Sequence, residues 1–274
     1  MILVCPKLTR KVFVFLVMCG SLAGGRPVSS AHGAGSGGRV QDGLQVLYDL
    51  RSLDGAIVKD HSGVAPPLDL RIENTKGVRR SAGGLEIVSG TVIRSEAPAP
   101  RLAEAVRQSG AIIIEAWVHP AKVDQSGPAR IVTLSPNSGE RNFTLGQDGE
   151  RFEVRLRTTR TDSNGIPAAA SRPKSLPKAL THVVYTRDRA GRARIYVNGR
   201  LNAEQRVEGS ASNWDTGYRI GLANELSGDR PWLGIIRLVA VYSRALPPEA
   251  VEQNFRAGSG PATAPALPVA KNDG

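Results

Sequence analysis

One glutamate in this 274-residue chain stands inside an apolar run, AIIIEAWVHP at residues 111–120. A carboxylate bordered by apolar strand residues suits glycoside cleavage, but that chemistry needs a second carboxyl group about 5–9.5 Å away. Glu115 has Ile113 and Trp117 as its two-residue neighbours, so no second acid shares its face of a strand. Neither of the nearest acidic pairs combines even spacing with an apolar-bordered strand: Glu150 with Glu153, and Glu204 with Glu208.

The same run predicts a strand whose two faces are both covered. Apolar residues occupy one face of 111–118 and surround Glu115 on the other. Because a buried carboxylate without a partner is expensive, we expect Glu115 to be paired and structural rather than catalytic. We expect Trp117 to anchor a core, with a cost of about 3–5 kcal/mol on truncation.

Loop residues offer a different chemistry, the binding of sugars. Trp214 lies between Asn213 and Asp215, a grouping that can stack a sugar ring and hydrogen-bond its hydroxyls. The alternative is a turn locked by an aromatic plug. The longest polar loop is 157–178, and its length favours a functional role.

Arginines near these loops suggest recognition of sulfates or uronates. Arg141, Arg155, Arg157 and Arg160 could form a basic strip, or they could simply be a solvated face. The loops 137–150 and 223–232 add further candidate ligand contacts, which are Asn142, Asn224, Glu225 and Asp229.

Other kinds of site are not indicated by the sequence. It contains no nucleophile elbow, phosphate loop, nucleic-acid motif or Cys/His zinc pattern. His61, His119 and His182 are dispersed along the chain. We expect His182 to pack where it enters a strand and to make a backbone hydrogen bond there.

Short segments with period-two alternation predict the elements that position these residues. In RFEVRLRTT at 151–159, apolar and charged residues alternate. Asn198-Gly199 suits a type I′ hairpin turn. Many short strands with two short helices predict an all-β, two-sheet antiparallel sandwich. Further strands are expected at 44–50, 181–188, 192–200 and 232–242, and helices at 100–110 and 246–255.

Residues 1–31 are typical of a secretory signal peptide. Three basic residues precede an apolar run at 12–24, which is shorter than the about 20 residues that a bilayer span requires. We therefore expect a secreted, periplasmic or cell-surface protein whose mature chain has no transmembrane segment. Both cysteines, Cys5 and Cys19, lie in the segment to be removed.

A Gly-rich leader at 32–41 and a Pro/Ala-rich tail at 258–274 are expected to be flexible, which leaves one domain at 42–257. Removing the signal removes four of the 36 Lys and Arg and none of the 25 Asp and Glu, so the mature net charge is 32 − 25 = +7. Such a basic exported chain suggests an acidic polysaccharide, an anionic cell surface or extracellular nucleic acid as partner. The alternative is that Arg merely replaces Lys as the common surface residue.

Four stretches occur in an order that matches a known family: LYDL with DGAIVKDHSG, IIIEAWVHP, LTHVVYTRDRAGRARIYVNGRL, and YRIGLANE with GDRPWLGIIRLVAVYSRALPPEAVEQNF. Together they resemble the LamG-like jelly-roll domain of the concanavalin A-like lectin/glucanase superfamily, and most of all its bacterial secreted type. The resemblance implies two antiparallel sheets of about six strands each, in a fold that hosts glucanases, lectins and adhesive modules. Its glucanases carry their acids in a Glu-x-Asp-x-Glu pattern, which this chain lacks.

The resemblance also raises the question of calcium, which extracellular modules bind weakly through carboxylates and carbonyls. Asp49, Asp54 and Asp60 match the acidic residues at the start of the family's domain. In the last long strand, however, Arg237 and Leu238 stand where the family usually has two acidic residues. We therefore expect no cofactor. A guanidinium should replace the metal, with Arg237 paired to Asp49 or Asp60.

The sequence as a whole favours a secreted, non-catalytic module that binds carbohydrate, including acidic glycans, or a cell-surface partner. One alternative is a glycoside hydrolase or polysaccharide lyase with an atypical site. Another is a purely structural surface protein.

Overall fold

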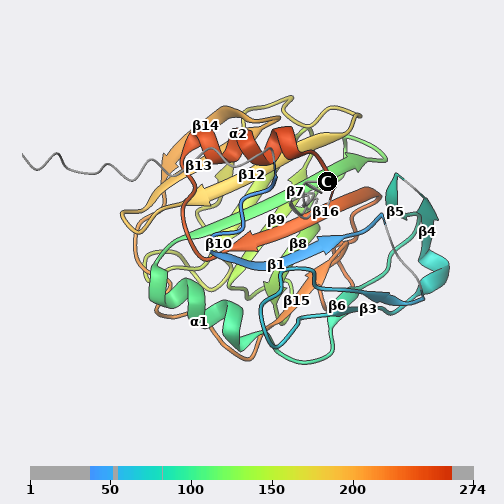
Figure 1. Cartoon of the computed structure of the whole chain (residues 1–274), viewed down its shortest axis with the longest axis horizontal. Helices are drawn as coiled ribbons and strands as arrows, with labels where there is room; N and C mark the ends of the chain where they lie inside the picture. The colour runs from blue at the N-terminus through green and yellow to red at the C-terminus, as the bar shows by residue number, and fades with distance from the viewer. Residues whose placement is uncertain (1–37, 52–54, 82, 261–274) are drawn as a thin grey trace, which may run out of the picture. The chain divides into compact units, whose positions relative to one another are not determined.

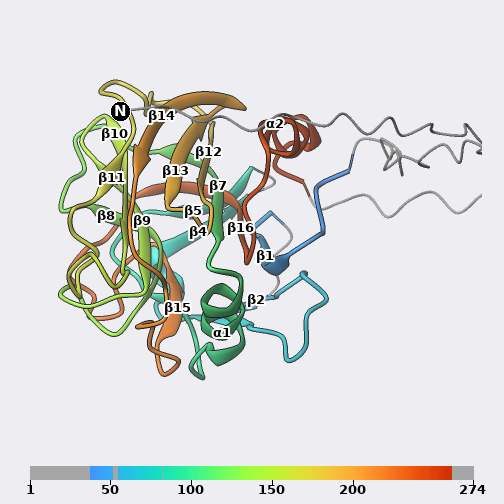
Figure 2. The same cartoon turned by 90° about the vertical axis from the view of Figure 1, so that its left-hand side faces the viewer.

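The computed structural model describes residues 38–51, 55–81 and 83–260. Within these residues the strands form two antiparallel sheets of eight strands each, which face one another as two layers (Figure 1, Figure 2). The predicted all-β sandwich is therefore confirmed. The sheets exceed the six strands expected because several edge strands are only two to four residues long, too short to show a pattern.

We call the two layers sheet A and sheet B. Sheet A runs in the order β14 (Arg200–Arg206), β13 (Arg192–Val197), β12 (Thr181–Arg187), β7 (Ile112–Pro120), β16 (Gly234–Tyr242), β5 (Gly84–Ile87) and β4 (Val78–Ser81), with β1 (Leu44–Asp49) also on β16. Sheet B runs in the order β11 (Ala169–Ala170), β10 (Arg151–Leu156), β9 (Phe143–Asp148), β8 (Ala129–Ser135), β15 (Arg219–Leu222), β6 (Ile93–Ser95), β3 (Leu70–Ile72) and β2 (Ile57–Val58).

The last long strand, β16, organises sheet A. One of its edges pairs with β7 along its whole length. Its other edge is shared, because β1 pairs with Leu238–Tyr242 and β5 pairs with Gly234–Ile236. The first strand of the described chain therefore lies beside the last one.

Alternating side chains build the core between the sheets. On β10, Phe152, Val154 and Leu156 are buried in this core, whereas Arg151 and Arg155 are partly exposed on the other face. This is the alternation predicted for 151–159, and it leaves a polar outer face on sheet B.

Both predicted helices are present, at α1 (Pro100–Ser109) and α2 (Pro248–Ala257). Each begins with proline, whose fixed φ suits a first helical position. Helix α1 buries Leu102 and Val106 in the core between the sheets. Helix α2 lies on the outer side of sheet A (Figure 2). No helix in the described part of the chain is long and apolar enough to cross a membrane.

A second apolar cluster fills the space between sheet A and α2. Trp117 is 7 % exposed and stacks on His182, with ring centroids 4.7 Å apart, and on Phe255 of α2, at 5.7 Å. Leu238 and Tyr242 of β16 belong to the same cluster. Trp117 therefore packs in this outer cluster and not in the core between the sheets.

Glu115 lies on the same face of β7 and is completely buried. Arg39 donates a hydrogen bond to its Oε1, His182 Nε2 lies 2.8 Å from the same oxygen, and Asn254 Nδ2 donates to Oε2 at 2.8 Å. Burial alone would raise the pKa of this carboxyl group. The charge of Arg39 and the contact with His182 outweigh burial and lower the pKa of Glu115 to about 2.

The partner Arg39 belongs to the segment expected to be a flexible leader, yet it is 3 % exposed. Its Nη2 donates to the carbonyl of Gly258 at 2.6 Å, and the N–H of Val40 donates to Asn254 Oδ1 at 2.8 Å. Residues 38–41 and 258–260 therefore pack on the domain, because they complete the burial of Glu115. The expected signal peptide at 1–31, the leader up to residue 37 and the tail from 261 lie outside the described residues.

Replacing Glu115 tests this cluster. Glu115→Gln should lower the free energy of unfolding by about 3–5 kcal/mol near neutral pH, because Arg39 loses its counter-charge in a buried site. Since the folded pKa is depressed to about 2 from its usual 4.5, the carboxylate stabilises the fold above that usual value and progressively less as the pH falls toward 2. Urea unfolding at neutral and acidic pH should therefore show a smaller loss on acidification for the variant.

Glu104→Gln, at an exposed position of α1, is the control and should change stability by less than about 0.5 kcal/mol. A Glu115→Gln protein as stable as the wild type at neutral pH would contradict the role of the pair.

Candidate functional site

Small side chains occupy the middle of the outer face of sheet B. Thr144 of β9 pairs with Thr133 of β8, and Thr133 pairs with Gly221 of β15. Arginines stand at both ends of this row, Arg155 on β10 and Arg94 on β6. Because residues directly opposite one another share a face, the whole polar row points away from the core.

The loop between β15 and β16 folds back over this row. A Cβ at Gly221 would lie 2.6 Å from Leu226 Cδ2, so a larger residue there would displace the Leu226 side chain. Asn224 fixes the shape of the loop, because its Oδ1 accepts hydrogen bonds from the N–H groups of Glu225 and Arg230, both at 2.9 Å. This shape places the Glu225 side chain against the sheet.

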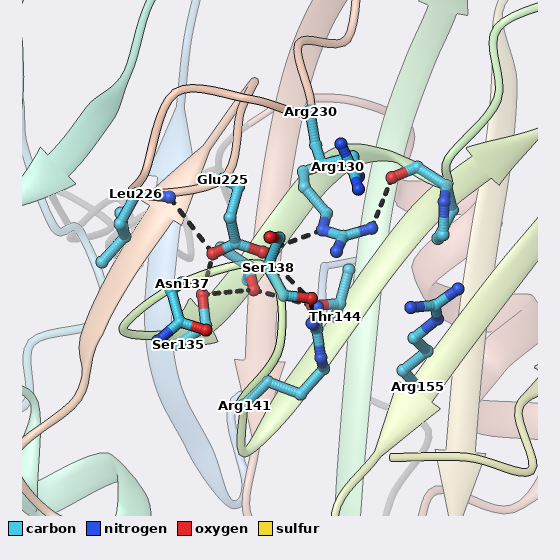
Figure 3. Close-up of polar contacts among 12 residues, drawn as sticks. Arg130, Ser135, Asn137, Ser138, Arg141, Thr144, Arg155, Glu225, Leu226 and Arg230 are labelled. Carbon is cyan, nitrogen blue, oxygen red and sulfur yellow. Dashed lines mark hydrogen bonds and ion pairs between the residues drawn. The ribbon is translucent and has the colours of Figure 1, made fainter. Parts of the chain in front are cut away.

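Glu225 is completely buried within a polar cluster (Figure 3). Its Oε1 accepts hydrogen bonds from the hydroxyl of Ser135 and, at 3.1 Å, from the N–H of Leu226. Its Oε2 accepts from Arg130 Nε at 2.9 Å and from Arg141 Nη1 at 3.4 Å. One carboxylate therefore serves two arginines.

The two arginines are as buried as the carboxylate, with no exposed side-chain surface. Burial and then repulsion by Arg130 lower the pKa of Arg141 to about 10, although Glu225 opposes the shift. Burial also lowers the pKa of Arg130. Both groups stay protonated at neutral pH, so the cluster keeps more positive than negative charge.

A hollow of about 260 Å³ opens beside this cluster. Ser135 lines the hollow and also binds Glu225, so the two features share a wall. Arg219 pairs in register with Ser135, so its side chain lies on the same face of sheet B. Arg219 makes no ion pair with a described residue. The hollow therefore offers cations, and its polar lining includes Arg94, Ser135, Tyr218 and Arg219.

Solved structures share this fold. The binding domain of botulinum neurotoxin DC in complex with rat synaptotagmin II matches with a TM-score of 0.55 and 12% identity, over 79% of this chain and 52% of that one. A structure of botulinum neurotoxin type C, a toxin whose cell entry depends on interaction with two ganglioside molecules, matches with a TM-score of 0.55 and 13% identity, over 79% and 52%. Trypanosoma rangeli sialidase in complex with sialic acid matches with a TM-score of 0.56 and 16% identity, over 78% and 33%.

At these identities the similarity is one of fold, and the chain spans only a third to a half of the solved chains. No curated protein matches the sequence. A family model described as the concanavalin A-like lectin/glucanases superfamily matches residues 96–252. The chain belongs to this superfamily. The resemblance seen in the sequence is thereby confirmed, and the superfamily includes binding domains as well as enzymes.

One residue expected to stack a sugar is placed differently in this concanavalin A-like domain. Trp214 is 3 % exposed and packs on Phe143, with ring centroids 6.0 Å apart. Its Nε1 donates to the carbonyl of Arg157 at 2.7 Å. Trp214 is thus the aromatic plug of a turn, and the stacking hypothesis is corrected because no ring face is open to a ligand.

The neighbours of Trp214 hold loops together. Asn142 Nδ2 donates to the carbonyl of Asp215 at 2.7 Å, and the N–H of Asp215 donates back to Asn142 Oδ1 at 2.9 Å. Asn213 Nδ2 donates to the carbonyl of Thr158 at 2.9 Å. These contacts fix the turn beside the outer face of sheet B.

Three predicted ligand residues do come together on that face: Arg141, Arg155 and Glu225. Arg155 pairs with Glu153 at 2.8 Å, so part of the predicted basic strip is neutralised. Arg157 Nη1 donates to the Tyr218 hydroxyl at 3.4 Å. Asn224 shapes the loop, and Asp229 is exposed near its tip, where it pairs with Arg230 at 3.2 Å.

The sequence analysis missed Arg130, Ser135 and Arg219. Arg130 carries a usable signal, because it is a charge inside the apolar run ARIVTLS at 129–135, as Glu115 is in its own run. Ser135 and Arg219 carry none, since only the pairing of β8 with β15 brings them together.

The predicted pairing of Arg237 with Asp49 or Asp60 is wrong. Arg101 Nη2 of α1 pairs with Asp60 at 2.7 Å, and Asp49 pairs with Arg51 at 3.0 Å. Arg237 sits at an irregularity between Ile236 and Leu238, where its side chain lies against Gly84 of β5. A guanidinium does neutralise Asp60, as expected, but it is that of Arg101 on helix α1.

Metal ligands are also scarce in this part of the chain. Asp60 Oδ1 accepts the N–H of Leu47 at 3.1 Å and Oδ2 accepts that of Leu68 at 3.1 Å, so hydrogen bonds occupy both oxygens. Across residues 38–51, 55–81 and 83–260, no three His, Cys, Asp or Glu side chains gather as a possible metal site.

Arg101→Gln should lower the free energy of unfolding by about 3 kcal/mol, because Asp60 would be left as a buried unpaired charge. Chemical denaturation measures this loss. Arg107→Gln, at an exposed position of the same helix, should lie within about 0.5 kcal/mol of the wild type. Equal stability of the two variants would rule out the Arg101–Asp60 pair as a structural tie.

Proposed function

We propose that this chain is a non-catalytic module that binds acidic glycans at the hollow beside Glu225. The observation that carries the proposal is the lining of that hollow, which contains two arginines, Arg94 and Arg219, together with Ser135 and Tyr218. A sugar ring with a carboxylate or sulfate group suits this set of partners, because arginine pairs with such groups through two parallel hydrogen bonds.

Charge supports an acidic ligand over a neutral one. The sequence has a formal net charge of +11 at pH 7. Arg219 has no ion-pair partner among the described residues, and Arg94 is held by Glu73 at 2.6 Å, at the rim of the hollow. A cation that is available to solvent attracts anions at long range and fixes their orientation at contact.

The solved relatives agree with a glycan ligand. One neighbour is a sialidase in complex with sialic acid, an acidic sugar, and another is named for its interaction with gangliosides. A third is in complex with a protein receptor. We favour the glycan for this chain because its hollow is small and polar, whereas a protein partner would need a broad contact surface.

The carboxylates support a binding role without catalysis. Most glycoside hydrolases use two carboxyl groups that face one substrate. Glu115 lies under α2 on sheet A, and the oxygens of Glu225 are occupied by Ser135, Leu226 and two arginines. With the signal peptide expected at 1–31, we also propose that the module acts outside the cytoplasm.

Replacing Arg219 tests the site. Arg219→Ala should weaken binding of an acidic glycan by about tenfold or more, because it removes a charge-assisted hydrogen bond. A glycan array identifies the ligand first, and titration calorimetry then compares the variants at low and high salt. Binding to the wild type should fade as salt screens the charges.

Arg192→Ala is the matched control, since Arg192 is an exposed arginine on β13 of the other sheet. Its affinity should equal that of the wild type. The proposal fails if no acidic glycan binds at low salt, or if Arg219→Ala and Arg192→Ala bind equally well.

A further inference from the structure

The cluster beneath the Glu225 loop places two fully buried guanidinium groups against one carboxylate. Figure 3 shows four arginine side chains around one region beside Glu225, namely Arg130, Arg141, Arg155 and Arg230. The charges of Arg155 and Arg230 contribute to lowering the pKa of Arg130. The charges of Arg130 and Arg155 do the same for Arg141. Three carboxylates pair directly with these arginines, namely Glu225, Glu153 and Asp229, and the charge of Asp162 also acts on Arg141, so the wider region is balanced. Within it, Arg130 and Arg141 share one direct partner, Glu225.

Several nitrogens of these arginines are buried and unused. Arg130 Nη2, Arg141 Nε and Arg230 Nε have no hydrogen-bond partner. A buried donor without an acceptor costs free energy comparable to a lost hydrogen bond, and native proteins leave few of them. Arg130 and Arg141 have no exposed side-chain surface, so bulk solvent does not compensate them.

A purely structural role would not need this arrangement. On sheet A the Glu115 cluster uses one arginine, Arg39, with His182 beside it, although Arg39 Nε also lacks a partner. The difference on sheet B is the second guanidinium, Arg141. The second guanidinium brings like-charge repulsion and raises the cost of burial. An acceptor of negative charge between the arginines would remove both costs.

We propose that Arg130 and Arg141, with Arg155 beside them, form a binding site for an oxyanion, the carboxylate or sulfate group of a ligand. The group would accept hydrogen bonds from Arg130 Nη2 and Arg141 Nε, the two donors left unused by Glu225. Arg155 is 16% exposed on the outer face of sheet B, and its charge acts on both Arg130 and Arg141.

The inference deepens the proposed function and rests on it for the identity of the ligand. Ser135 binds Glu225 and lines the hollow, and it is therefore the residue that links the proposed glycan site to the arginine cluster. The anion site itself is a separate claim about small ions, and it is tested without any glycan.

Thermal unfolding in low-millimolar sodium sulfate measures the site directly, with sodium chloride keeping the ionic strength constant. A ligand that binds only the folded state raises the midpoint in a saturable way. Low concentrations avoid the general stabilising effect of sulfate at high concentration. We expect a saturable rise for the wild type and none for Arg141→Met, which removes one guanidinium and fills its space.

Glu225→Gln should change the sulfate affinity in the opposite direction from Arg141→Met. Without the internal carboxylate the arginines should bind sulfate about tenfold more tightly than the wild type does. Glu104→Gln is the control, because it makes the same change at an exposed position of α1 that contacts neither cluster. Its sulfate affinity should equal that of the wild type.

The inference is overturned if the wild type shows no saturable response, or if Arg141→Met responds as the wild type does. The comparison of the wild type with Arg141→Met tests the anion site even if Glu225→Gln does not fold. Glucuronate and a sulfated oligosaccharide, added in competition with sulfate, distinguish a glycan group from an inorganic ion as the ligand. Sulfate binding with no effect of Arg219→Ala on glycans would leave the anion site standing while the proposed function fails.

Discussion

A buried carboxylate has to be matched by a cation, and this requirement shapes both outer faces of the sandwich. On sheet A, Glu115 brings Arg39 of the N-terminal segment and Asn254 of α2 onto one strand. On sheet B, Glu225 brings its loop down onto Arg130 and Arg141. In each case a polar contact, and not apolar burial alone, decides which segment covers the sheet.

The two clusters differ in how well their charges balance. Glu115 is neutralised by one arginine, and the remaining partners are a histidine and an amide. Glu225 faces two fully buried arginines, with a third nearby. A balanced cluster is what a structural tie needs. An unbalanced one leaves attraction for a further anion, and for that reason we place binding on sheet B rather than under α2.

The local pattern of the sequence was enough to predict the layers. Alternation located β10, β12 and β13, and the segments 100–110 and 246–255 were recognised as helices, because these signals depend on neighbours a few residues apart. The pattern also indicated that Glu115 is paired. It could not name Arg39, which lies 76 residues away in a Gly-rich stretch that looks flexible.

The candidate site was harder to predict for the same reason. Glu225, Arg141 and Arg155 were recognised as polar residues of interest, but their meeting depends on the register of β8, β9 and β15. The pairing of Arg237 failed because an irregularity in β16 turns that residue toward β5. The prediction that Trp214 stacks a sugar was wrong because the sequence of a polar loop does not indicate whether a tryptophan ring faces solvent or the core.

The shared edge of β16 sets a lower limit on the piece of chain that can fold by itself. Both β1 and β5 precede the region 96–252 that matches the family model, yet together they cover that edge. A fragment cut to the matched region would present a long row of unpaired backbone N–H and C=O groups, the usual template for aggregation. The unit that folds by itself therefore extends back to Arg39, well before residue 96, where the match to the family model begins.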